Sequence, residues 1–309
     1  MDKRRIGSLE VTTAGLGCNN FGWRIDAAAT KQVVDAALDA GINFFDTANI
    51  YSKGESETYL GNALGHRRND IVLATKFGHS SDETRVEGSA AYIRKALEDS
   101  LVRLKTDYVD LYQPHKPDPK TPIADVLSEL DKLVREGKVR EIGASNFTVD
   151  QIREAEADVA SGAARFVSIQ NNYSMFHRDD EPAGVLEACK QYSIAYLPFF
   201  PLANGLLTGK YRRGKPLPEG SRASDEFGPK VFTPENIDKV EELIAFTEQR
   251  GHTILELAFV WLLANPVIPS IIAGAKTPEQ VKNNAAAVSW HLSENDLAEI
   301  DAILPAPAS

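Results

Sequence analysis

Short strand-like runs alternate with longer helix-like segments along almost the whole chain, and this alternation limits the possible folds more than any other feature of the sequence. Runs rich in β-branched and aromatic residues predict strands over residues 14–17, 43–47, 71–76, 108–115, 139–145, 166–170, 194–200 and 269–273. Helical periodicity predicts helices over residues 30–40, 56–64, 89–104, 122–136, 149–161, 181–192, 234–250 and 253–264, with a further helix starting at Pro278. Alternation of this kind implies parallel strands joined by right-handed crossovers.

The strand-like runs also indicate how the sheet is arranged. Residues 71–75 and 108–112 are almost continuously apolar, which is typical of strands that are buried on both faces. Strand–helix units that repeat eight times without a visible break favour a closed barrel over an open sheet. The sequence therefore predicts a (β/α)₈ barrel, in which residues 1–309 form one domain.

Three segments fall outside this repeat. Residues 4–13 alternate in polarity around Gly7 and Ser8, which predicts an N-terminal β-hairpin. Residues 293–304 predict an extra C-terminal helix, with Ser293 as its N-cap and Asp296 three positions later. Residues 211–233 are rich in Gly, Pro, Arg and Ser. We interpret them as a long loop over the barrel mouth, because the strand–helix pattern resumes after them.

Composition excludes several classes of function. A net charge of −10 argues against a nucleic-acid partner, which would require a basic surface. No stretch has the roughly 18 consecutive apolar residues that a membrane span requires, and the charged N-terminus does not resemble a signal peptide. Cys18 and Cys189 lack metal-binding or CxxC spacing, so we expect reduced thiols and a cytoplasmic protein. The oligomeric state is left open.

Ionisable residues follow three consecutive predicted strands. Asp46 and Tyr51 follow the second strand, Lys76 ends the third and His115 ends the fourth. In a (β/α)₈ barrel, active sites lie at the carboxyl ends of the strands. Each residue has a structural explanation when taken alone, such as helix capping for Asp46 or packing for Tyr51. Their convergence on one rim nevertheless favours a functional site.

These residue types suit acid–base chemistry at a carbonyl oxygen. A lysine at the end of a buried strand needs a partner, and Asp46 is the nearest candidate. The ammonium group would lower the pKa of Tyr51 and help the phenol to give up its proton. His115 could hydrogen-bond the same substrate oxygen. No motif indicates a metal site or a covalent nucleophile, so a nicotinamide cofactor is expected to complete the chemistry.

The residues around this rim resemble the aldo-keto reductase superfamily, and the resemblance extends over nearly the whole chain. The family signature Gly-x-x-x-x-Asp-Thr-Ala-x-x-Tyr is matched within GINFFDTANIYSKGESETYLGNAL, and the histidine segment is similar to DLYQPH. Later family motifs are similar to GASNF, QNNYS and GLLTGKY. The resemblance implies NADPH-dependent reduction of an aldehyde or ketone in a barrel without a Rossmann domain. It also implies that Asp46, Tyr51, Lys76 and His115 form the catalytic tetrad, with Tyr51 as the acid.

The same resemblance implies a set of NADPH contacts. Ser145, Asn146 and Gln170 match residues that hold the nicotinamide carboxamide, and Phe199 matches a stacking aromatic that is usually Tyr or Trp. Asn283 stands where the family often has Glu. The expected cofactor residues are Gly22, Trp23, Asp46, Ser145, Asn146, Gln170, Phe199, Phe200, Pro201, Leu202, Gly205, Leu207, Thr208, Lys210, Arg222, Gly274, Lys276, Gln280, Asn283 and Asn284.

Lys276 is a phosphate-binding candidate on physical grounds as well. It lies just before the helix predicted to start at Pro278, where free backbone N–H groups and the helix dipole attract anions. A lysine at this position would bind the 2′-phosphate that distinguishes NADPH from NADH. The sequence therefore favours NADPH.

Two other functions remain open, and the identity of the substrate is not given. Trp23, Tyr51 and His115 are expected to line a substrate pocket suited to planar or apolar aldehydes. The chain is also similar to potassium-channel β subunits in its seventh loop, so an NADPH-binding sensor or regulatory subunit is one alternative. Those subunits usually lack the histidine that is present here as His115. The other alternative is a barrel lyase or isomerase with Lys76 as Schiff-base nucleophile, which requires an unpaired lysine.

Overall fold

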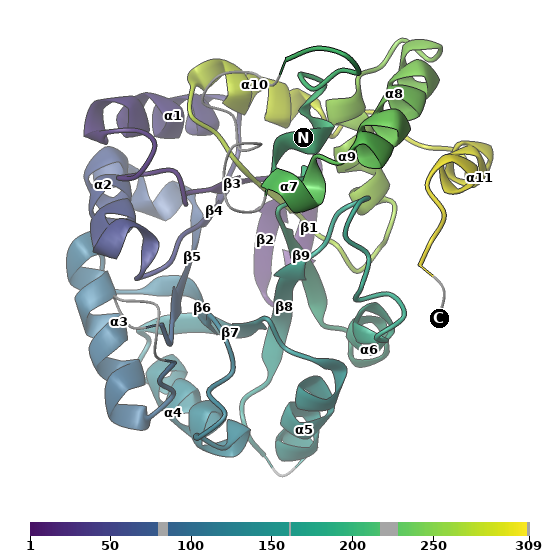
Figure 1. The fold of residues 1–309 in the computed structure, drawn as a ribbon. Coiled ribbons are helices and arrows are strands. Elements are labelled where there is room, and N and C mark those ends of the chain that lie inside the picture. Colours follow the sequence, from purple (N-terminus) through teal and green to yellow (C-terminus); the bar gives the residue numbers. More distant parts are fainter. Residues whose placement is uncertain (80–85, 161, 217–227, 308–309) are drawn as a thin grey trace.

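The structure is a computed structural model that describes residues 1–79, 86–160, 162–216 and 228–307. Parallel strands alternate with helices and form one eight-stranded sheet with the order β10-β3-β4-β5-β6-β7-β8-β9 (Figure 1). The strands are β3 (Ala14–Gly17), β4 (Phe44–Asp46), β5 (Val72–Phe77), β6 (Val109–Pro114), β7 (Val139–Ser145), β8 (Phe166–Asn172), β9 (Ala195–Phe199) and β10 (Ile271–Gly274).

The sheet curls until its two edge strands approach each other. The backbone N–H of Tyr196 in β9 donates a hydrogen bond of 2.8 Å to the carbonyl oxygen of Val267, a few residues before β10. The result is a nearly closed (β/α)₈ barrel, which confirms the fold predicted from the alternating sequence pattern.

The helices surround the strands (Figure 1). α4 shows why: Ile123, Val126, Leu127, Leu130 and Leu133 are buried at helical spacing, which gives the helix one apolar face toward the sheet. The helices are α1 (Ala27–Asp39), α2 (Glu55–Leu64), α3 (Ala90–Leu104), α4 (Ile123–Arg135), α5 (Val149–Ala160), α6 (Val185–Tyr192), α7 (Gly228–Val231), α8 (Pro234–Glu248), α9 (Ile254–Leu263), α10 (Pro278–Ala286) and α11 (Glu294–Ile303). No helix of the described residues has both the length and the apolar composition needed to cross a membrane.

The predicted N-terminal hairpin is present and lies at the amino-terminal end of the barrel. It consists of β1 (Lys3–Ile6) and β2 (Leu9–Thr12), joined by Gly7 and Ser8, with Gly7 at a φ of 56°. Its apolar side chains Ile6, Leu9 and Val11 pack in one cluster with Phe44 and Val72, the first residues of β4 and β5. Because the hairpin covers this end, the opposite end of the barrel is left for a site.

The register of the strands places the candidate residues at one level. Asp46 pairs with Gly17 on one side and Ala74 on the other, and Ser145 pairs with Gln170. Lys76 pairs with Gln113, two residues before His115. The carboxyl ends of these strands therefore share one rim, as the sequence predicts.

Some predicted boundaries differ from the structure. The strand predicted over residues 166–170 continues to Asn172, and the helix predicted from residue 181 begins at Val185 because a turn precedes it. Ser293 caps α11 through a capping box with Asp296, as predicted. The loop predicted over residues 211–233 contains the short helix α7 in its described part, and its residues 217–227 lie outside the described residues.

Candidate functional site

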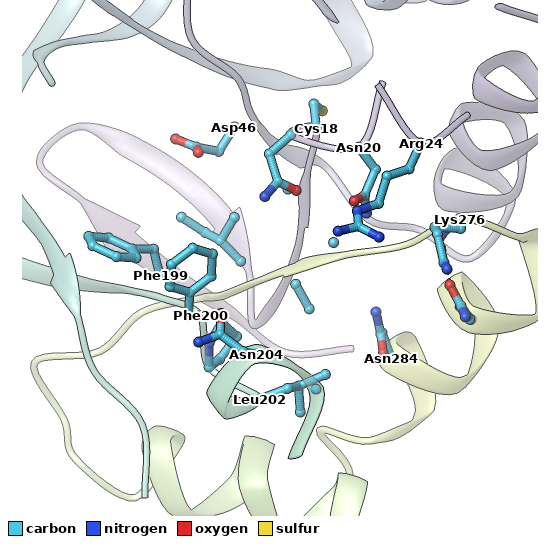
Figure 2. A pocket seen from close by; sticks show the side chains of 18 of the residues that line it. Cys18, Asn20, Arg24, Asp46, Phe199, Phe200, Leu202, Asn204, Lys276 and Asn284 are labelled. Carbon is cyan, nitrogen blue, oxygen red and sulfur yellow. Dashed lines mark hydrogen bonds between the residues drawn. The ribbon is translucent and has the colours of Figure 1, made fainter. Parts of the chain in front are cut away.

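A cavity of about 520 Å³ opens at the carboxyl ends of the barrel strands (Figure 2). Its walls are formed by the ends of β3, β4, β7 and β8, by the segment that follows β9, and by the start of α10. The expected site residues that line it are Asp46, Tyr51, His115, Ser145, Asn146, Gln170, Phe199, Phe200, Pro201, Leu202, Gly205, Thr208, Lys210, Gly274, Lys276, Gln280, Asn283 and Asn284.

The other expected residues that the structure describes do not line this cavity. Lys76 is completely buried beneath it, and Leu207 is a fully buried core residue. Gly22 and Trp23 lie in the loop after β3, where the Trp23 side chain is 62% exposed and turned outward. The prediction that Trp23 lines the pocket is therefore corrected. Arg222 lies outside the described residues.

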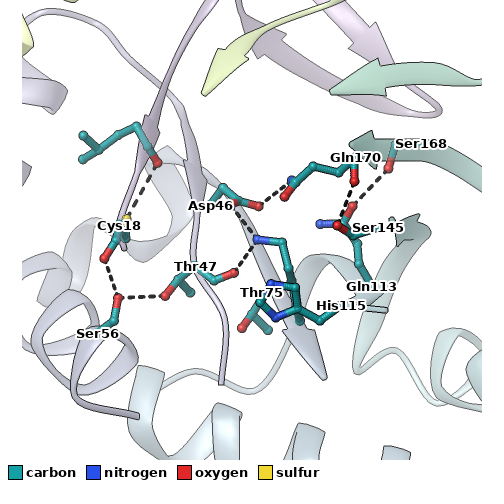
Figure 3. A network of polar contacts seen from close by, with 12 residues as sticks. Cys18, Asp46, Thr47, Ser56, Thr75, Gln113, His115, Ser145, Ser168 and Gln170 are labelled. Atoms are coloured by element: carbon teal, nitrogen blue, oxygen red, sulfur yellow. Dashed lines mark hydrogen bonds and ion pairs between the residues drawn. The ribbon is translucent and has the colours of Figure 1, made fainter. Parts of the chain in front are cut away.

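Lys76 and Asp46 form a buried ion pair at the base of the cavity (Figure 3). The Lys76 Nζ atom lies 2.6 Å from Asp46 Oδ2 and donates a second hydrogen bond of 2.9 Å to the Thr47 carbonyl oxygen. The other carboxylate oxygen of Asp46 accepts a hydrogen bond of 2.9 Å from Gln170 Nε2. Burial alone would lower the pKa of Lys76, but Asp46 and Tyr51 outweigh it and hold that pKa above its ordinary value. The ammonium group is therefore charged and fixed in place.

Tyr51 begins the short 3₁₀ helix η1 (Tyr51–Gly54), which follows β4 after a four-residue loop. Ser52 and Lys53 adopt left-handed backbone angles, with φ values of 50° and 56°, and the Ser52 hydroxyl donates a hydrogen bond of 2.9 Å to the Phe21 carbonyl. This anchored turn places the Tyr51 ring 5.4 Å from the Lys76 ammonium. The phenol therefore lies between the ion pair and the cavity.

The pKa of Tyr51 differs from the sequence-based expectation. Burial raises it above the ordinary value, and the Lys76 ammonium only partly offsets this effect. The direction of the lysine's effect was predicted correctly, but the larger effect of burial was missed. The phenol is consequently protonated at neutral pH, which is the form that can act as a proton donor.

His115 faces Tyr51 from the end of β6. The two rings meet edge to face, with their centroids 5.8 Å apart, and the ring of His79 lies 5.0 Å from His115 on another side. Burial lowers the pKa of His115 well below 6.5, and the positive charges of Lys76, His79 and Lys116 act in the same direction. His115 is therefore a neutral imidazole that can still donate one hydrogen bond.

Polar side chains from β7 and β8 continue the wall beside Asp46. Asn146 adopts a left-handed φ of 60°, and its side-chain amide donates to the His115 carbonyl oxygen at 2.9 Å. The Ser145 hydroxyl donates to the Gln170 carbonyl oxygen at 2.7 Å. These bonds hold the Ser145 hydroxyl and the Asn146 amide at the end of the cavity that contains Tyr51, and Asp46 holds the Gln170 amide beside them.

The opposite end of the cavity is formed by the start of α10. Thr277 caps this helix by accepting a hydrogen bond from the Gln280 backbone N–H, and the Gln280 side chain accepts one from the Lys276 backbone N–H at 2.7 Å. Asn283 and Asn284 line the same end. Lys276 thus lies beside a helix N-terminus, an arrangement that favours anions.

Sequence reasoning missed several cavity residues. Asn20 and Arg24 line the cavity from the loop after β3, Asn204 lines it from the 3₁₀ helix η3 (Ala203–Thr208), and Cys18 directly follows β3. No motif distinguishes them, although proximity to the end of β3 could have identified Cys18. Among the described residues, no group of three or more His, Cys, Asp or Glu side chains is arranged to hold a metal ion.

Comparisons with known proteins identify the family of this chain and agree with its fold. The model of the aldo/keto reductase family matches residues 13–305. The chain is 36% identical to a putative voltage-gated potassium channel subunit beta from Schizosaccharomyces pombe, over 90% of this chain and 85% of that protein. Two solved structures each match 100% of this chain and 98% of their own. A glycerol dehydrogenase from Gluconobacter oxydans has a TM-score of 0.85 and 31% identity. The holo form of an aldo-keto reductase from Bacillus halodurans has a TM-score of 0.83 and 32% identity.

Proposed function

The chain belongs to the aldo/keto reductase family, and we propose that it uses NADPH to reduce the carbonyl group of a small aldehyde or ketone to the alcohol, in a reversible reaction. One observation carries this proposal. A protonated phenol, a buried ammonium–carboxylate pair and a neutral imidazole meet at one end of a long cavity, and a lysine at a helix N-terminus marks the other end.

The cavity suits a nicotinamide dinucleotide. Lys276 and the first turn of α10 offer a positive site for a phosphate, and the amide groups of Asn146 and Gln170 offer hydrogen-bonding partners for a carboxamide. Phe199 lines the cavity on the same side as Asp46, away from Lys276 (Figure 2), and offers an aromatic ring for contact with a nicotinamide. When bound, the reduced cofactor would supply a hydride to the carbonyl carbon.

Each of the four rim residues then has a distinct task. Tyr51 donates its proton to the carbonyl oxygen as that oxygen gains negative charge. Lys76 stabilises the phenolate that remains on Tyr51, and Asp46 holds Lys76 charged and in position. His115, being neutral, donates a hydrogen bond to the same oxygen and orients the carbonyl group.

The structure argues against the Schiff-base alternative, whereas one observation favours the regulatory alternative. The Schiff-base alternative requires an unpaired, neutral lysine, whereas Lys76 is paired with Asp46 at 2.6 Å and its pKa is raised. The NADPH-binding regulatory alternative is favoured by the similarity to a potassium channel subunit beta. The presence of His115 beside Tyr51 supports an enzyme.

The decisive experiment measures binding and turnover in succession. NADPH binding is followed by quenching of intrinsic fluorescence, and the nicotinamide absorbance is then followed with a panel of aldehydes and ketones. Substrate-dependent oxidation would support the reductase and begin to identify its substrate. Binding without turnover of any carbonyl would favour the regulatory alternative, and failure to bind NADPH would contradict the proposal.

We expect Lys276→Ala to weaken NADPH binding by about 10- to 100-fold, because a charged hydrogen bond to a phosphate contributes roughly 1.5–3 kcal/mol. NADH lacks the 2′-phosphate, so its Kd should change by less than about threefold. Lys282→Ala is the matched control, since Lys282 is an exposed lysine in the same helix that does not line the cavity. Titration calorimetry with both cofactors provides the measurement. Equal losses for NADPH and NADH would exclude a 2′-phosphate contact.

The pH dependence of reduction should be flat between about pH 6 and pH 9. Tyr51 must be protonated to act as the acid, and its raised pKa means that this form is lost only as pH rises past about 10. His115 is neutral throughout this range because its pKa is depressed well below 6.5. Measurement of kcat/KM against pH tests both assignments. An inflection near pH 7 would show that one of the two groups has been assigned the wrong protonation state.

A further inference from the structure

Ser56 is a buried serine that joins the ends of two barrel strands to a surrounding helix. It lies in the first turn of α2, shortly after Tyr51, and its side chain is completely buried. The Ser56 hydroxyl donates a hydrogen bond of 2.8 Å to the carbonyl oxygen of Cys18, the residue that follows β3. The Ser56 Oγ atom also lies 2.9 Å from Oγ1 of Thr47, the residue that follows β4 (Figure 3).

The direction of the second hydrogen bond follows from the first. A serine hydroxyl carries one proton and a backbone carbonyl oxygen can only accept, so the Ser56 proton is used in the bond to Cys18. Thr47 must therefore donate to Ser56. The result is an ordered hydroxyl chain, which runs from Thr47 through Ser56 to the Cys18 carbonyl oxygen.

Thr47 lies just beyond the regular pairing of its strand with β3. That pairing ends at Gly17 and Asp46. On the β5 side, the Thr47 backbone N–H donates a hydrogen bond of 2.9 Å to the Ala74 carbonyl oxygen. On the other side, the hydroxyl bond to Ser56 takes the place of further strand pairing. A contact with α2 therefore helps to fix the Thr47 backbone.

The position of the Thr47 backbone matters because its carbonyl oxygen belongs to the charged site. The Lys76 Nζ atom donates a hydrogen bond of 2.9 Å to this oxygen, in addition to its ion pair with Asp46. A buried ammonium group depends on such acceptors, since no water replaces one that is lost. Displacement of the Thr47 carbonyl would therefore shift the ammonium group or deprive it of one acceptor.

The same helix is continuous with the segment that carries the phenol. The 3₁₀ helix η1 begins at Tyr51 and leads directly into α2. Next to Ser56, the buried carboxylate of Glu57 accepts a hydrogen bond of 2.5 Å from Thr75, the residue before Lys76 in β5. Adjacent residues of α2 thus contact both strands that carry the ion pair. The start of α2 sets the position of the phenol relative to the ammonium group.

We propose that Ser56, acting through Thr47, is a positioning residue that holds the Lys76 ammonium group in place beside Tyr51 during proton transfer. The inference rests on the proposed function, since it gives the hydroxyl chain a task in carbonyl reduction. Neither Ser56 nor Thr47 lines the cavity, so their effect on turnover is transmitted through the ion pair and the phenol.

Paired substitutions at Thr47 test the proposal. Thr47→Val keeps the branched shape but removes the hydroxyl. The kcat for NADPH-dependent reduction of para-nitrobenzaldehyde should then fall by about tenfold or more, because misplaced catalytic groups can lower a rate by up to about 100-fold. Thr47→Ser keeps the hydroxyl and should recover most of this loss. The Kd for NADPH should change by less than about threefold in both variants, because an interaction that serves only proton transfer lowers kcat alone.

Thr247→Val is the matched control for the loss of a buried hydroxyl. Thr247 is completely buried in α8, where its hydroxyl donates a hydrogen bond of 2.9 Å to the Ile244 carbonyl oxygen, and it does not line the cavity. The control should lower the melting temperature and leave kcat unchanged. The proposal is overturned if Thr47→Val lowers kcat no more than the control does, or if Thr47→Ser is as slow as Thr47→Val.

Ser56→Ala removes the same hydrogen bond from the other side and should also lower kcat. Combined with Thr47→Val, it should lower kcat by much less than the product of the two single losses, because both substitutions break one chain. Losses that multiply would overturn the proposal. Wild-type protein is assayed first. If it does not oxidise NADPH with the aldehyde, the proposed function fails. If it does, and Thr47→Val and Ser56→Ala turn over normally, only this inference fails.

Discussion

Replacing Tyr51 by phenylalanine is expected to lower kcat by about 10²- to 10⁴-fold, which is the range that general acid catalysis contributes. The Kd for NADPH should stay within about twofold, because the substitution removes one hydroxyl and leaves the phosphate end of the cavity unchanged. The ring itself remains, so its contacts with His115 and Lys76 are preserved. The decrease in kcat should therefore reflect the loss of proton transfer and not the loss of cofactor binding.

This prediction is checked by steady-state kinetics with a carbonyl substrate and by calorimetric titration of NADPH. Tyr108→Phe is the matched control, because the Tyr108 hydroxyl bonds to Asn69 at an exposed position away from the cavity. The control should retain full activity. If Tyr51→Phe keeps a tenth or more of the wild-type rate, another group must supply the proton.

Replacing Lys76 by methionine should reduce kcat by about 100-fold or more while the protein stays folded. The ammonium group lowers the pKa of Tyr51 against the opposing effect of burial, so its removal makes the phenol a weaker acid. Breaking a buried ion pair also costs stability, on the order of 3 kcal/mol. Asp46 limits that loss, because it keeps its hydrogen bond from Gln170.

Circular dichroism and thermal melting establish folding, and kinetics with a saturating substrate give kcat. Lys31→Met serves as the control, since Lys31 also pairs with an aspartate, Asp35, at 2.6 Å, but at an exposed position. Near-normal turnover by Lys76→Met would refute the role of the ammonium group. Borohydride trapping of a substrate on Lys76 in the wild type would instead revive the Schiff-base mechanism.

The barrel and its rim could be predicted because both depend on local, repeating features of the sequence. β3 and β7 match their predicted bounds, since apolar runs and flanking turns define a buried strand without reference to the rest of the chain. Once the strands are known, parallel topology alone places Asp46, Lys76 and Gln170 at one rim. Their convergence follows from the fold class.

The orientation of loop side chains and the pKa values of buried groups could not be predicted from the sequence. Trp23 and Arg24 are neighbours, yet Arg24 lines the cavity whereas Trp23 is exposed, and no sequence pattern distinguishes the two. The pKa of Tyr51 depends on two opposing effects, and the sequence indicates the charge of Lys76 but not the extent of burial. Such properties arise from tertiary contacts between distant segments, which no local pattern encodes.

The hairpin stabilises the amino-terminal end of the barrel, whereas the candidate active site lies at the opposite end. Arg4 of β1 donates hydrogen bonds to the carbonyl oxygens of Leu263 and Ile268, which fastens the hairpin to the connection that leads into β10. The cavity opens at the opposite end. Substitutions in the cavity loops can therefore change which substrates bind without disturbing the hairpin contacts that stabilise the other end of the barrel. The same separation offers protein engineers a base to reinforce independently of selectivity.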